Sequence, residues 1–315
     1  MNNDLKLSRH TVAVIVAYNS DLELVRQILL SLKEQCPVVI IDNGSAQALV
    51  NLLKNLVTGF CGAELLCLDE NTGIAHAQNV AINHIINTYN TVTYVLLLDH
   101  DSIPDRHMVR SLEDVFNNLV KQQINVAAVG PVLYDPRDDK YLNFHKARFG
   151  IWGKIKPAGI DRENSVVEVD GLNSSGTLLS IAALREVGGF DDNLFIDHVE
   201  TDWCFRARHS GLRLFATTRA ILTHHMGDDV CYYWAFGRRR MPYRSPSRHY
   251  YLMRNSILLQ KREYVPISWK LSNLLKIGFT IFYFGYYYKD RTKQRRQIYL
   301  GVTDGLKGVT GPANH

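Results

Sequence analysis

Short apolar runs alternate with segments of helical spacing over the first 133 residues of the chain. Thr11–Ala17 is a continuous apolar run typical of a buried strand, whereas Leu22–Leu32 places apolar side chains at i, i+3, i+7 and i+10 on one helix face. The same alternation predicts further strands and helices at Val38–Ile41, Ala48–Leu56, Glu64–Leu68, Ile74–Ile86, Thr93–Leu98, the segment from Pro104 to about Gln122, and Val126–Leu133. Strands separated by helices predict an α/β fold with a parallel central sheet and crossover helices.

The predicted elements become shorter after residue 134. Residues 135–165 are polar and mixed in composition, and they indicate loops and short strands. Beyond them the pattern predicts strands at Val166–Asp170 and Gly176–Ile181, helices at Ala182–Val187 and Glu200–His209, and two short strands at Arg213–Ala216 and Ala220–Thr223.

Basic and aromatic residues are concentrated at one end of the 315-residue chain. Residues 229–315 hold 16 Lys and Arg against 4 Asp and Glu, a net charge of +12 within a total of +5, and 17 of the 32 aromatic residues. We therefore expect a main domain over residues 1–228 and a basic, aromatic-rich region over 229–315. Such a region suits an anionic membrane surface or nucleic acid, and a solvated basic helix pair packed on the main domain has the same composition.

Leu274–Tyr288 is apolar and aromatic, and the basic run Lys289–Arg296 follows it. This combination favours a segment lying in the interface of an anionic leaflet, with a homodimer surface as the alternative. No stretch of about 18 apolar residues predicts a spanning helix. The five cysteines lack a CxxC pair and the N-terminus lacks an apolar signal, so we expect a cytoplasmic protein that is peripheral on the membrane.

Polar residues follow the ends of several predicted strands. Tyr18, Asp42, Asn71 and the pair Asp99 and Asp101 all come soon after apolar runs. Ligands of open α/β sheets bind beyond the carboxyl ends of the strands, so we expect these residues to share one crevice. Tyr18 would stack on a base and Asp42 would accept hydrogen bonds from a base or ribose, although the segment from Asp42 also has the composition of a simple turn.

Asp99 and Asp101 close an apolar strand, which is an unfavourable place for two charges unless a cation binds. Carboxylates at i and i+2 before a turn supply oxygen ligands to a hard divalent cation, and such a cation neutralises a departing nucleotide diphosphate. The alternative role, capping of the next helix, suits Asp105 better.

The helix that follows Asn71-Thr72-Gly73 has small residues in its first turns, up to Asn79. Amides at a helix N-terminus suit a phosphate or a sugar hydroxyl, and ordinary capping with close helix packing explains the pattern equally well.

A second acidic cluster lies at a predicted loop-to-helix junction. Asp197, Glu200 and Asp202 fall within six residues, and Asp197 and Glu200 would lie on one side of a helical turn. Acids are common at helix N-termini through the helix dipole alone, but a carboxylate here is also suited to deprotonate an incoming hydroxyl. Asp202 has an alternative structural partner in Arg206 at i+4.

His224 and His225 follow the last predicted strand, and adjacent strand residues point to opposite faces. We expect His224 to be the one that faces the site, as a third metal ligand or as a buried, hydrogen-bonded histidine.

The motifs together resemble the inverting glycosyltransferase family 2, which has the GT-A fold. The resemblance covers about residues 11 to 260. It is carried by Val14-Ile15-Val16-Ala17-Tyr18-Asn19, Ile41-Asp42-Asn43-Gly44-Ser45, Asn71-x-Gly73-x-Ala75-x-Ala77-x-Asn79 and Leu98-Asp99-x-Asp101-Ser102. Later motifs are similar to its rhamnosyltransferase branch: Ser175-Gly176-x-x-x-Ser180, Gly188-Gly189-Phe190-Asp191, Phe195-Ile196-Asp197, Asp202-Trp203-Cys204-x-Arg206 and Tyr251-x-x-Arg254-Asn255.

The resemblance implies a dTDP- or UDP-linked sugar donor and a divalent cation (Mg²⁺ or Mn²⁺). It also implies that the catalytic base lies six residues before the helix arginine Arg206, so that the base is Glu200. Asp197 is the second candidate for that base, and His224 matches a family histidine. The implied metal ligands are Asp99, Asp101 and His224. The implied contacts to the nucleotide sugar are Tyr18, Asp42, Asn71, Asn79, Asp99, Ser175, Gly176, Asp202 and Arg254.

From these features we expect an inverting, metal-dependent transfer of a sugar, L-rhamnose through the branch resemblance, to a lipid-linked saccharide in O-antigen or other surface polysaccharide synthesis. A galactofuranosyl- or glucosyltransferase remains open. A nucleotidyltransferase is disfavoured because no glycine-rich basic loop lies near the N-terminus. A nucleic-acid-binding protein would not need the carboxylates at positions 99, 101, 197 and 200.

Overall fold

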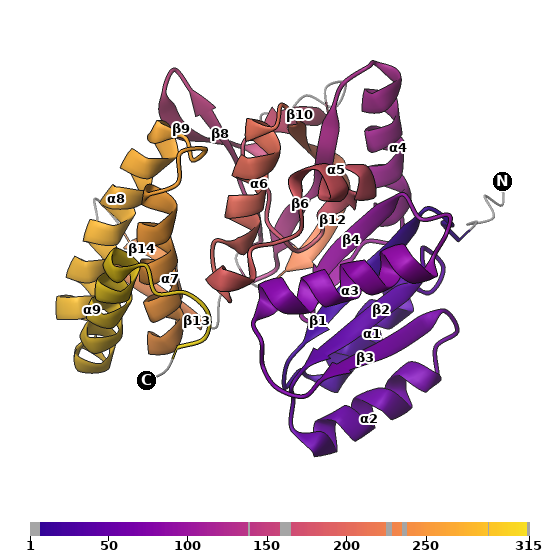
Figure 1. Cartoon of the computed structure of the whole chain (residues 1–315), viewed down its shortest axis with the longest axis horizontal. Helices are drawn as coiled ribbons and strands as arrows, with labels where there is room; N and C mark the ends of the chain where they lie inside the picture. The colour runs from indigo at the N-terminus through magenta and orange to yellow at the C-terminus, as the bar shows by residue number, and fades with distance from the viewer. Residues whose placement is uncertain are drawn as a thin grey trace.

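The computed structural model describes residues 7–137, 139–157, 165–224, 229–234, 238–288 and 290–313. The region predicted to be the main domain contains a ten-stranded sheet with helices on both faces (Figure 1). Its central path runs in the order β10-β12-β6-β11-β4-β1-β2-β3. These strands are β1 (Thr11–Ala17), β2 (Val38–Asn43), β3 (Ala63–Leu68), β4 (Tyr94–Asp99), β6 (Val126–Asp135), β10 (Val166–Val169), β11 (Leu178–Ser180) and β12 (Arg213–His224), with β5 (Ser102–Pro104) paired to β12 and β7 (Lys140–Tyr141) to β6.

The sheet separates two hydrophobic cores. Alternate residues of β1 point to opposite sides, so that Val14 packs in one core and Ile15 in the other. The first core is covered by α3 (Ile74–Thr88), α5 (Ile181–Val187) and α6 (Val199–His209). The second is covered by α1 (Leu22–Leu32), α2 (Gln47–Thr58) and α4 (Met108–Lys121).

The predicted α/β fold with a mostly parallel sheet is confirmed. The pairs β1–β2, β1–β4, β2–β3 and β6–β12 are parallel, whereas β11, β10 and β5 pair antiparallel with their neighbours. The prediction of two short strands near residues 213–223 was wrong: they form the single strand β12, whose register shifts between Thr217 and Ile221. A bulge of this kind places turn-like residues inside a continuous strand.

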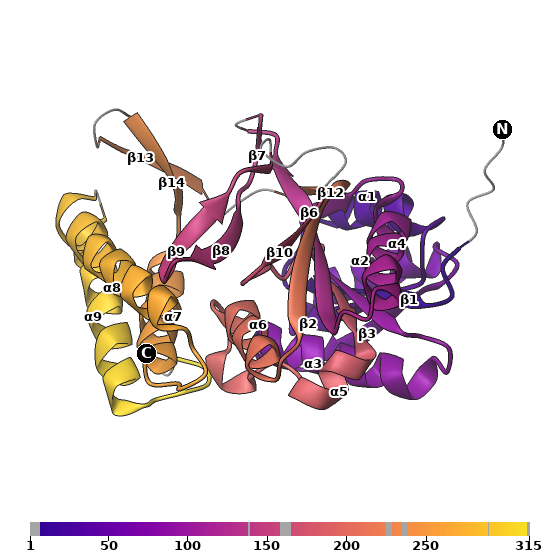
Figure 2. The same ribbon diagram turned by 90° about the horizontal axis from the view of Figure 1, so that it is seen from above.

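The C-terminal region forms a helical layer beside the sheet (Figure 2). It begins with the hairpin β13 (Asp229–Trp234) and β14 (Arg238–Tyr243), which was not predicted. The helices α7 (Pro246–Gln260), α8 (Ile267–Phe282) and α9 (Arg291–Lys307) follow, with the π-helical turn η3 (Tyr283–Tyr287) between the last two. A second hairpin of β8 (Phe144–Arg148) and β9 (Ile151–Ile155) contacts α8 from the main domain.

The two regions share buried surface. Leu258 and Leu259 of α7 and Trp269 of α8 belong to the same core as Trp203 and Phe205 of α6. The boundary predicted near residue 228 falls at residues outside the described ranges and remains a prediction. Within the described residues, no helix is both long enough and apolar enough to cross a bilayer.

Candidate active site

Four residues predicted to contact the nucleotide sugar lie at or just after the carboxyl ends of four strands, at one edge of the sheet. In the sheet register Ala17 lies beside Asp42 and Val16 lies beside Asp99. The loops beyond these strands are tied together, because the amide of Asn19 donates to Ser45 Oγ at 2.8 Å. Tyr18 is exposed at this edge, and buried Asp42 accepts a hydrogen bond from the amide of Ser45 at 2.9 Å.

The N-terminus of α3 is closed by another part of the chain. Asn71 Oδ1 caps the turn by accepting from the amide of Gly73 at 3.0 Å, and the amide of Ile74 donates to the carbonyl of Phe195 at 2.8 Å. Gly73 has φ +88°, and a Cβ there would lie 2.6 Å from the same carbonyl oxygen. Close packing, one of the two alternatives for this motif, therefore accounts for the glycine.

Asn79, predicted to contact the nucleotide sugar, is occupied within the protein. Its Nδ2 donates to the carbonyl of Phe190 at 2.8 Å and to Asp192 at 2.6 Å, while its Oδ1 accepts from the amide of Phe190 at 2.8 Å. These bonds join α3 to the segment before α6, so we assign Asn79 a structural role instead.

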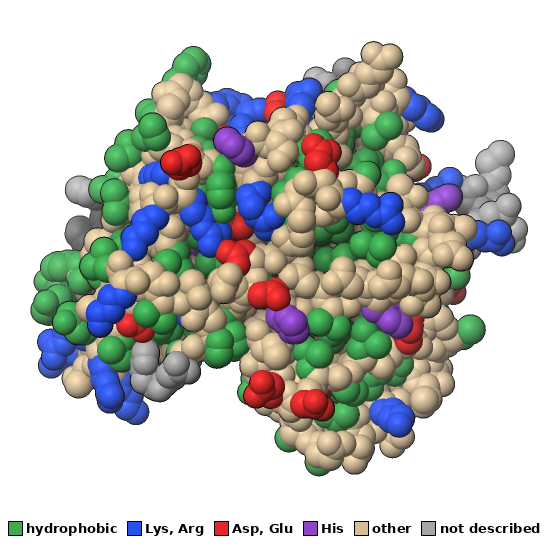
Figure 3. Space-filling view, in the orientation of Figure 1, with side chains coloured by type: hydrophobic (Ala, Val, Ile, Leu, Met, Phe, Trp, Pro, Cys, Tyr) green, Lys and Arg blue, Asp and Glu red, His purple; other side chains and the backbone are tan. Residues whose placement is uncertain are grey.

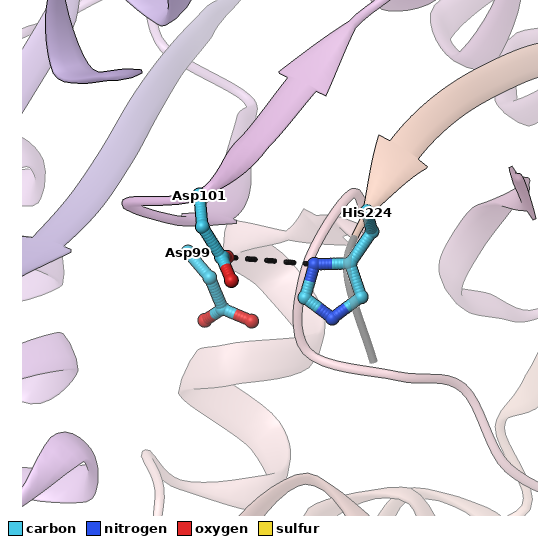
Figure 4. Close-up of side chains that lie close together, drawn as sticks. All are labelled: Asp99, Asp101 and His224. Atoms are coloured by element: carbon cyan, nitrogen blue, oxygen red, sulfur yellow. Dashed lines mark ion pairs between the residues drawn. The ribbon is translucent and has the colours of Figure 1, made fainter. Parts of the chain in front are cut away.

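Asp99, Asp101 and His224 converge into one cluster (Figure 4). Asp99 ends β4, Asp101 lies in the following turn and His224 ends β12, so the cluster joins residues more than a hundred positions apart. One potential ligand atom from each residue lies within 4.8 Å of the others, and His224 Nδ1 lies 3.5 Å from Asp101 Oδ1. His225 lies outside the described residues.

The electrostatics of the cluster suit a cation. Burial raises the pKa of Asp99, and the neighbouring charge of Asp101 adds to this effect. Burial opposes the charge of His224, but its contacts with the two carboxylates outweigh that effect and raise the pKa of the imidazole. Two carboxylates and an imidazole are a ligand set that suits Mn²⁺ or Mg²⁺.

Two serines, Ser102 and Ser175, contact residues of the cluster. Ser102 Oγ lies 2.6 Å from His224 Nδ1 and accepts from Ser175 Oγ at 2.7 Å, and Ser175 Oγ in turn accepts from the amide of Asp99 at 3.0 Å. Gly176 follows with its amide donating to the carbonyl of Leu97 at 2.7 Å. Ser175 and Gly176 thus contact the strand that carries Asp99. Ser102 contacts His224, a role that sequence reasoning did not assign to this motif residue.

The loop before α6 has an unusual backbone. Phe195, Asp197 and His198 have φ of +62°, +66° and +66°, a region that non-glycine residues rarely occupy. Helix α7 holds this loop in place, because Asn255 Nδ2 donates to the carbonyls of residues 194, 196 and 197 at 2.8, 2.8 and 2.9 Å. The ring of Phe195 also stacks on Tyr251 with centroids 4.8 Å apart. Strain held by surrounding structure is characteristic of functional sites.

Asp197 is held in an ion pair. Arg248 Nε and Nη2 donate to its two oxygens at 2.8 and 2.9 Å, and Arg244 Nε lies 3.7 Å from Oδ1. Burial opposes the charge of Asp197, but these arginines outweigh it and lower the pKa of the carboxyl. A carboxylate with a low pKa and a bidentate partner is a poor proton acceptor, so the geometry favours the other candidate base.

Glu200, in the first turn of α6, has the opposite environment. Burial raises its pKa to about 7, and repulsion from Asp197 and Asp99 contributes to the shift. Glu200 borders a small crevice together with Asn173, Ser174 and Trp203. A carboxyl with a pKa of about 7 that is close enough to Asp99 to be repelled by its charge is suited to general base catalysis.

A neighbouring crevice shares Asn173 and is lined by Ser175 and His145. Among buried side-chain atoms of the described residues, His145 Nδ1 is without a hydrogen-bond partner. Such an atom marks a place for a water or a ligand hydroxyl.

Asp202 and Arg254, also predicted to bind the nucleotide sugar, have internal partners instead. Fully buried Asp202 accepts from Arg206 at 2.9 Å, from Tyr264 at 2.5 Å and from Arg262. Fully buried Arg254 donates to the carbonyl of Leu194 at 3.1 Å and also to that of Gly311. Asp202 joins α6 to the C-terminal region, and Arg254 joins that region to the loop before α6. We assign both residues a structural role.

Comparison with known proteins agrees with this architecture. Residues 12–165 match the sequence profile of Glycosyl transferase family 2. The chain is 28% identical over 311 residues to a curated Shigella flexneri protein named dTDP-rhamnosyl transferase RfbF, covering 97% of this chain and 98% of that protein.

Solved structures share the fold at low sequence identity. The structure of GalNAc-T7 with UDP, GalNAc and Mn²⁺ superposes with a TM-score of 0.57 and 11% identity, over 98% of this chain and 57% of that one. The structure of S. aureus TarS 1-349 in complex with UDP-GlcNAc also gives a TM-score of 0.57, with 15% identity over 95% of this chain and 81% of that one.

Proposed function

The chain is a glycosyltransferase of family 2 with the GT-A fold, and from that premise we propose that it transfers L-rhamnose from dTDP-rhamnose to a saccharide hydroxyl with inversion of configuration. The full-length similarity to a protein named dTDP-rhamnosyl transferase supports this donor. The observation that carries the proposed chemistry is Glu200, a half-buried residue whose carboxyl pKa is raised to about 7, with repulsion from Asp99 contributing to the shift.

The proposed donor site follows the carboxyl edge of the sheet. Tyr18 stacks on the thymine or uracil base, and Asp42 accepts hydrogen bonds from the nucleoside. Asp99, Asp101 and His224 would hold the divalent cation, since their ligand atoms already lie within 4.8 Å of one another. When bound, the cation neutralises the diphosphate and so stabilises the leaving group.

Glu200 is the proposed general base. It removes the proton of the acceptor hydroxyl, and the resulting oxygen attacks the anomeric carbon as the bond from that carbon to the diphosphate oxygen breaks. A single displacement from the face opposite the leaving group inverts the configuration. Asp197 is then a positioning residue, because Arg248 occupies both of its oxygens.

The acceptor in this proposal is a lipid-linked saccharide used in O-antigen or related polysaccharide synthesis. The net charge of +12 over residues 229–315 supports a peripheral position on the anionic inner face of the plasma membrane. In this proposal a soluble nucleotide sugar and a membrane-bound acceptor react at Glu200.

Purified protein should be screened against nucleotide sugars with Mn²⁺ or Mg²⁺, and without either cation. We expect metal-dependent hydrolysis and thermal stabilisation to be strongest with dTDP-rhamnose. Preference for a UDP-linked galactofuranose or glucose would replace the sugar while keeping the mechanism. Failure to bind or hydrolyse any nucleotide sugar would overturn the proposal.

A further inference from the structure

Helix α8 has an apolar face that points to solvent. Ile267, Leu271, Leu274, Leu275 and Phe282 fall within an arc of about 100° when drawn at 3.6 residues per turn. All five are exposed, Leu275 to 78% and Ile267 to 75%. The opposite side of the helix packs on the protein through Trp269, Asn273 and Ile277, so α8 is apolar on both sides. A surface helix normally turns polar residues outward.

A second apolar element lies beside this face. The β8–β9 hairpin contacts α8. Its turn carries Phe149, which is fully exposed, and β9 begins with Ile151, which is 72% exposed. Both ribbon views place the hairpin next to α8, although the two are more than a hundred residues apart in the chain (Figures 1 and 2). The space-filling view shows hydrophobic side chains along this edge of the molecule (Figure 3).

Basic residues flank both elements along the chain. Residues 267–296 contain seven Lys and Arg against one acid, Asp290, and residues 144–156 contain four against none. Arg148 adjoins Phe149, and Arg291, Lys293 and Arg295 follow the end of the apolar face; all four cations are exposed. Exposed Tyr286 and Tyr287 lie between the apolar face and these cations. Tyrosine at such a boundary is typical of the membrane–water interface.

We propose that the outward face of α8 and the tip of the β8–β9 hairpin together form one surface that inserts into an anionic lipid bilayer. The apolar stripe enters the acyl boundary, and the surrounding cations contact the headgroups. Two separated contacts fix the orientation of the protein on the membrane, which one amphipathic helix leaves free to rotate. This inference rests on the proposed membrane-bound acceptor and specifies how the enzyme meets it.

Helix α8 also contacts the loop that precedes Glu200. Trp269, on the inner side of α8, contacts His198 edge to face with ring centroids 5.4 Å apart, and His198 lies two residues before Glu200. His198 Nε2 also lies 2.9 Å from Ser256 Oγ of α7. Helix α8 and the residues next to Glu200 are therefore joined through packed side chains.

A second copy of the chain is the competing occupant, because the spacing at residues 267, 271, 274 and 278 also suits helix pairing. Charge argues against it. In a symmetric dimer the same surface faces itself, so the exposed Arg148, Arg291, Lys293 and Arg295 would meet the same four cations of the partner. An anionic bilayer complements that charge.

The test is flotation of the full-length protein with phosphatidylglycerol–phosphatidylcholine vesicles. The variants are Leu271→Asp with Leu275→Asp on the stripe, Phe149→Ser with Ile151→Ser on the hairpin, and Leu52→Asp on α2 as a matched control at another exposed leucine. Each large apolar side chain that enters the lipid is worth about tenfold or more in partition. We expect the stripe variant to lose binding at least about a hundredfold, the hairpin variant at least about tenfold, and the control to bind like the native protein.

Thermal melts and donor hydrolysis without vesicles check folding and the donor site separately. Both should stay at native levels in all three variants. Two results would overturn the inference: a hairpin variant that binds vesicles as well as the native protein does, or a native protein that does not bind anionic vesicles at low salt. So would a stripe variant that changes a dimer into a monomer while keeping vesicle binding. Absent donor hydrolysis in every protein would instead refute the proposed function and leave the lipid result interpretable.

Discussion

Replacing Arg248 with glutamine should raise the pH at which the enzyme becomes active. Arg248 neutralises Asp197 through two hydrogen bonds of 2.8 and 2.9 Å. Asp197 lies three positions before Glu200, and its charge already contributes to the raised pKa of about 7 at Glu200. Without Arg248, the uncompensated carboxylate of Asp197 disfavours the ionised, proton-accepting form of Glu200. The pKa of Glu200 should therefore rise further.

The expected shift follows from the charges that face Glu200. At an effective dielectric constant of about 20, two unit charges repel by about 4 kcal/mol at about 4 Å and by about half as much at twice that distance, so a nearby uncompensated carboxylate is worth roughly 1.5 pKa units or more. Arg244 remains 3.7 Å from Asp197 and offsets part of this repulsion, so we expect a shift of about one unit. Asp99 also faces Glu200, and a bound cation reduces its effect equally in both proteins.

The assay is the pH dependence of kcat for sugar transfer at saturating donor and metal. Activity should rise with pH through the pKa of Glu200 in both proteins, with the midpoint about one unit higher in Arg248→Gln. Near neutral pH this corresponds to roughly a fivefold loss of kcat, which higher pH restores. Arg248→Lys should shift the midpoint less because it keeps the charge.

Arg213→Gln is the matched control, since it removes the remote ion pair with Glu168 at 3.0 Å. Loss of an ion pair also costs stability, so a thermal melt must show that each variant stays folded at the assay temperature. A folded Arg248→Gln protein with an unshifted midpoint, or a loss of kcat that high pH does not restore, would refute the coupling.

Three further predictions concern the metal cluster, the loop and the buried histidines. Ser102→Ala removes the contact of 2.6 Å to His224 and should weaken Mn²⁺ binding about 10- to 100-fold, measured by titrating Mn²⁺ against Tm; an unchanged titration midpoint would contradict it. Gly73→Ala should cost about 1–3 kcal/mol in urea unfolding and lower kcat, because the new Cβ meets the carbonyl of Phe195; native stability would show that the loop is not held there. Burial lowers the pKa of His145, His198 and His249 from 6.5 to about 4, so these side chains are neutral in the folded protein. Their contribution to stability is complete above pH 6.5 and is lost as the pH falls toward 4, because the unfolded chain then binds more protons. Tm should therefore drop across that window, and an unchanged Tm would contradict the prediction.

The sequence pattern predicted the main elements well because one face of each is buried. Leu22–Leu32 and Thr11–Ala17 match α1 and β1 residue for residue. The pattern failed where pairing is non-local. The bulge in β12 and the antiparallel insertion of β11 between β4 and β6 depend on neighbours that are distant in the chain. The β13–β14 hairpin is rich in arginine and lacks the alternation that signals a strand.

The site divides in the same way. Asp99, Asp101 and His224 were placed together because each follows a strand, and strand ends of one sheet meet at an edge. Asp202 looked like a site residue, but its partner Arg262 lies 60 positions away and has no signal in the local sequence. Arg248 was missed for the same reason: its i+4 relation to Arg244 shows only a basic helix start, whereas its partner Asp197 comes from the loop before α6.

The role of Glu200 is tested most directly by comparing Glu200→Gln with the native enzyme, using dTDP-rhamnose, Mn²⁺ and a lipid-linked saccharide. Removing a general base costs about 10²- to 10⁴-fold, so kcat should fall by at least a hundredfold while the Kd for the donor stays within about twofold. Asp197→Asn should retain more activity than Glu200→Gln, because Asp197 acts only by position. Near-native kcat in Glu200→Gln, with donor binding intact, would contradict the assignment of Glu200 as the base.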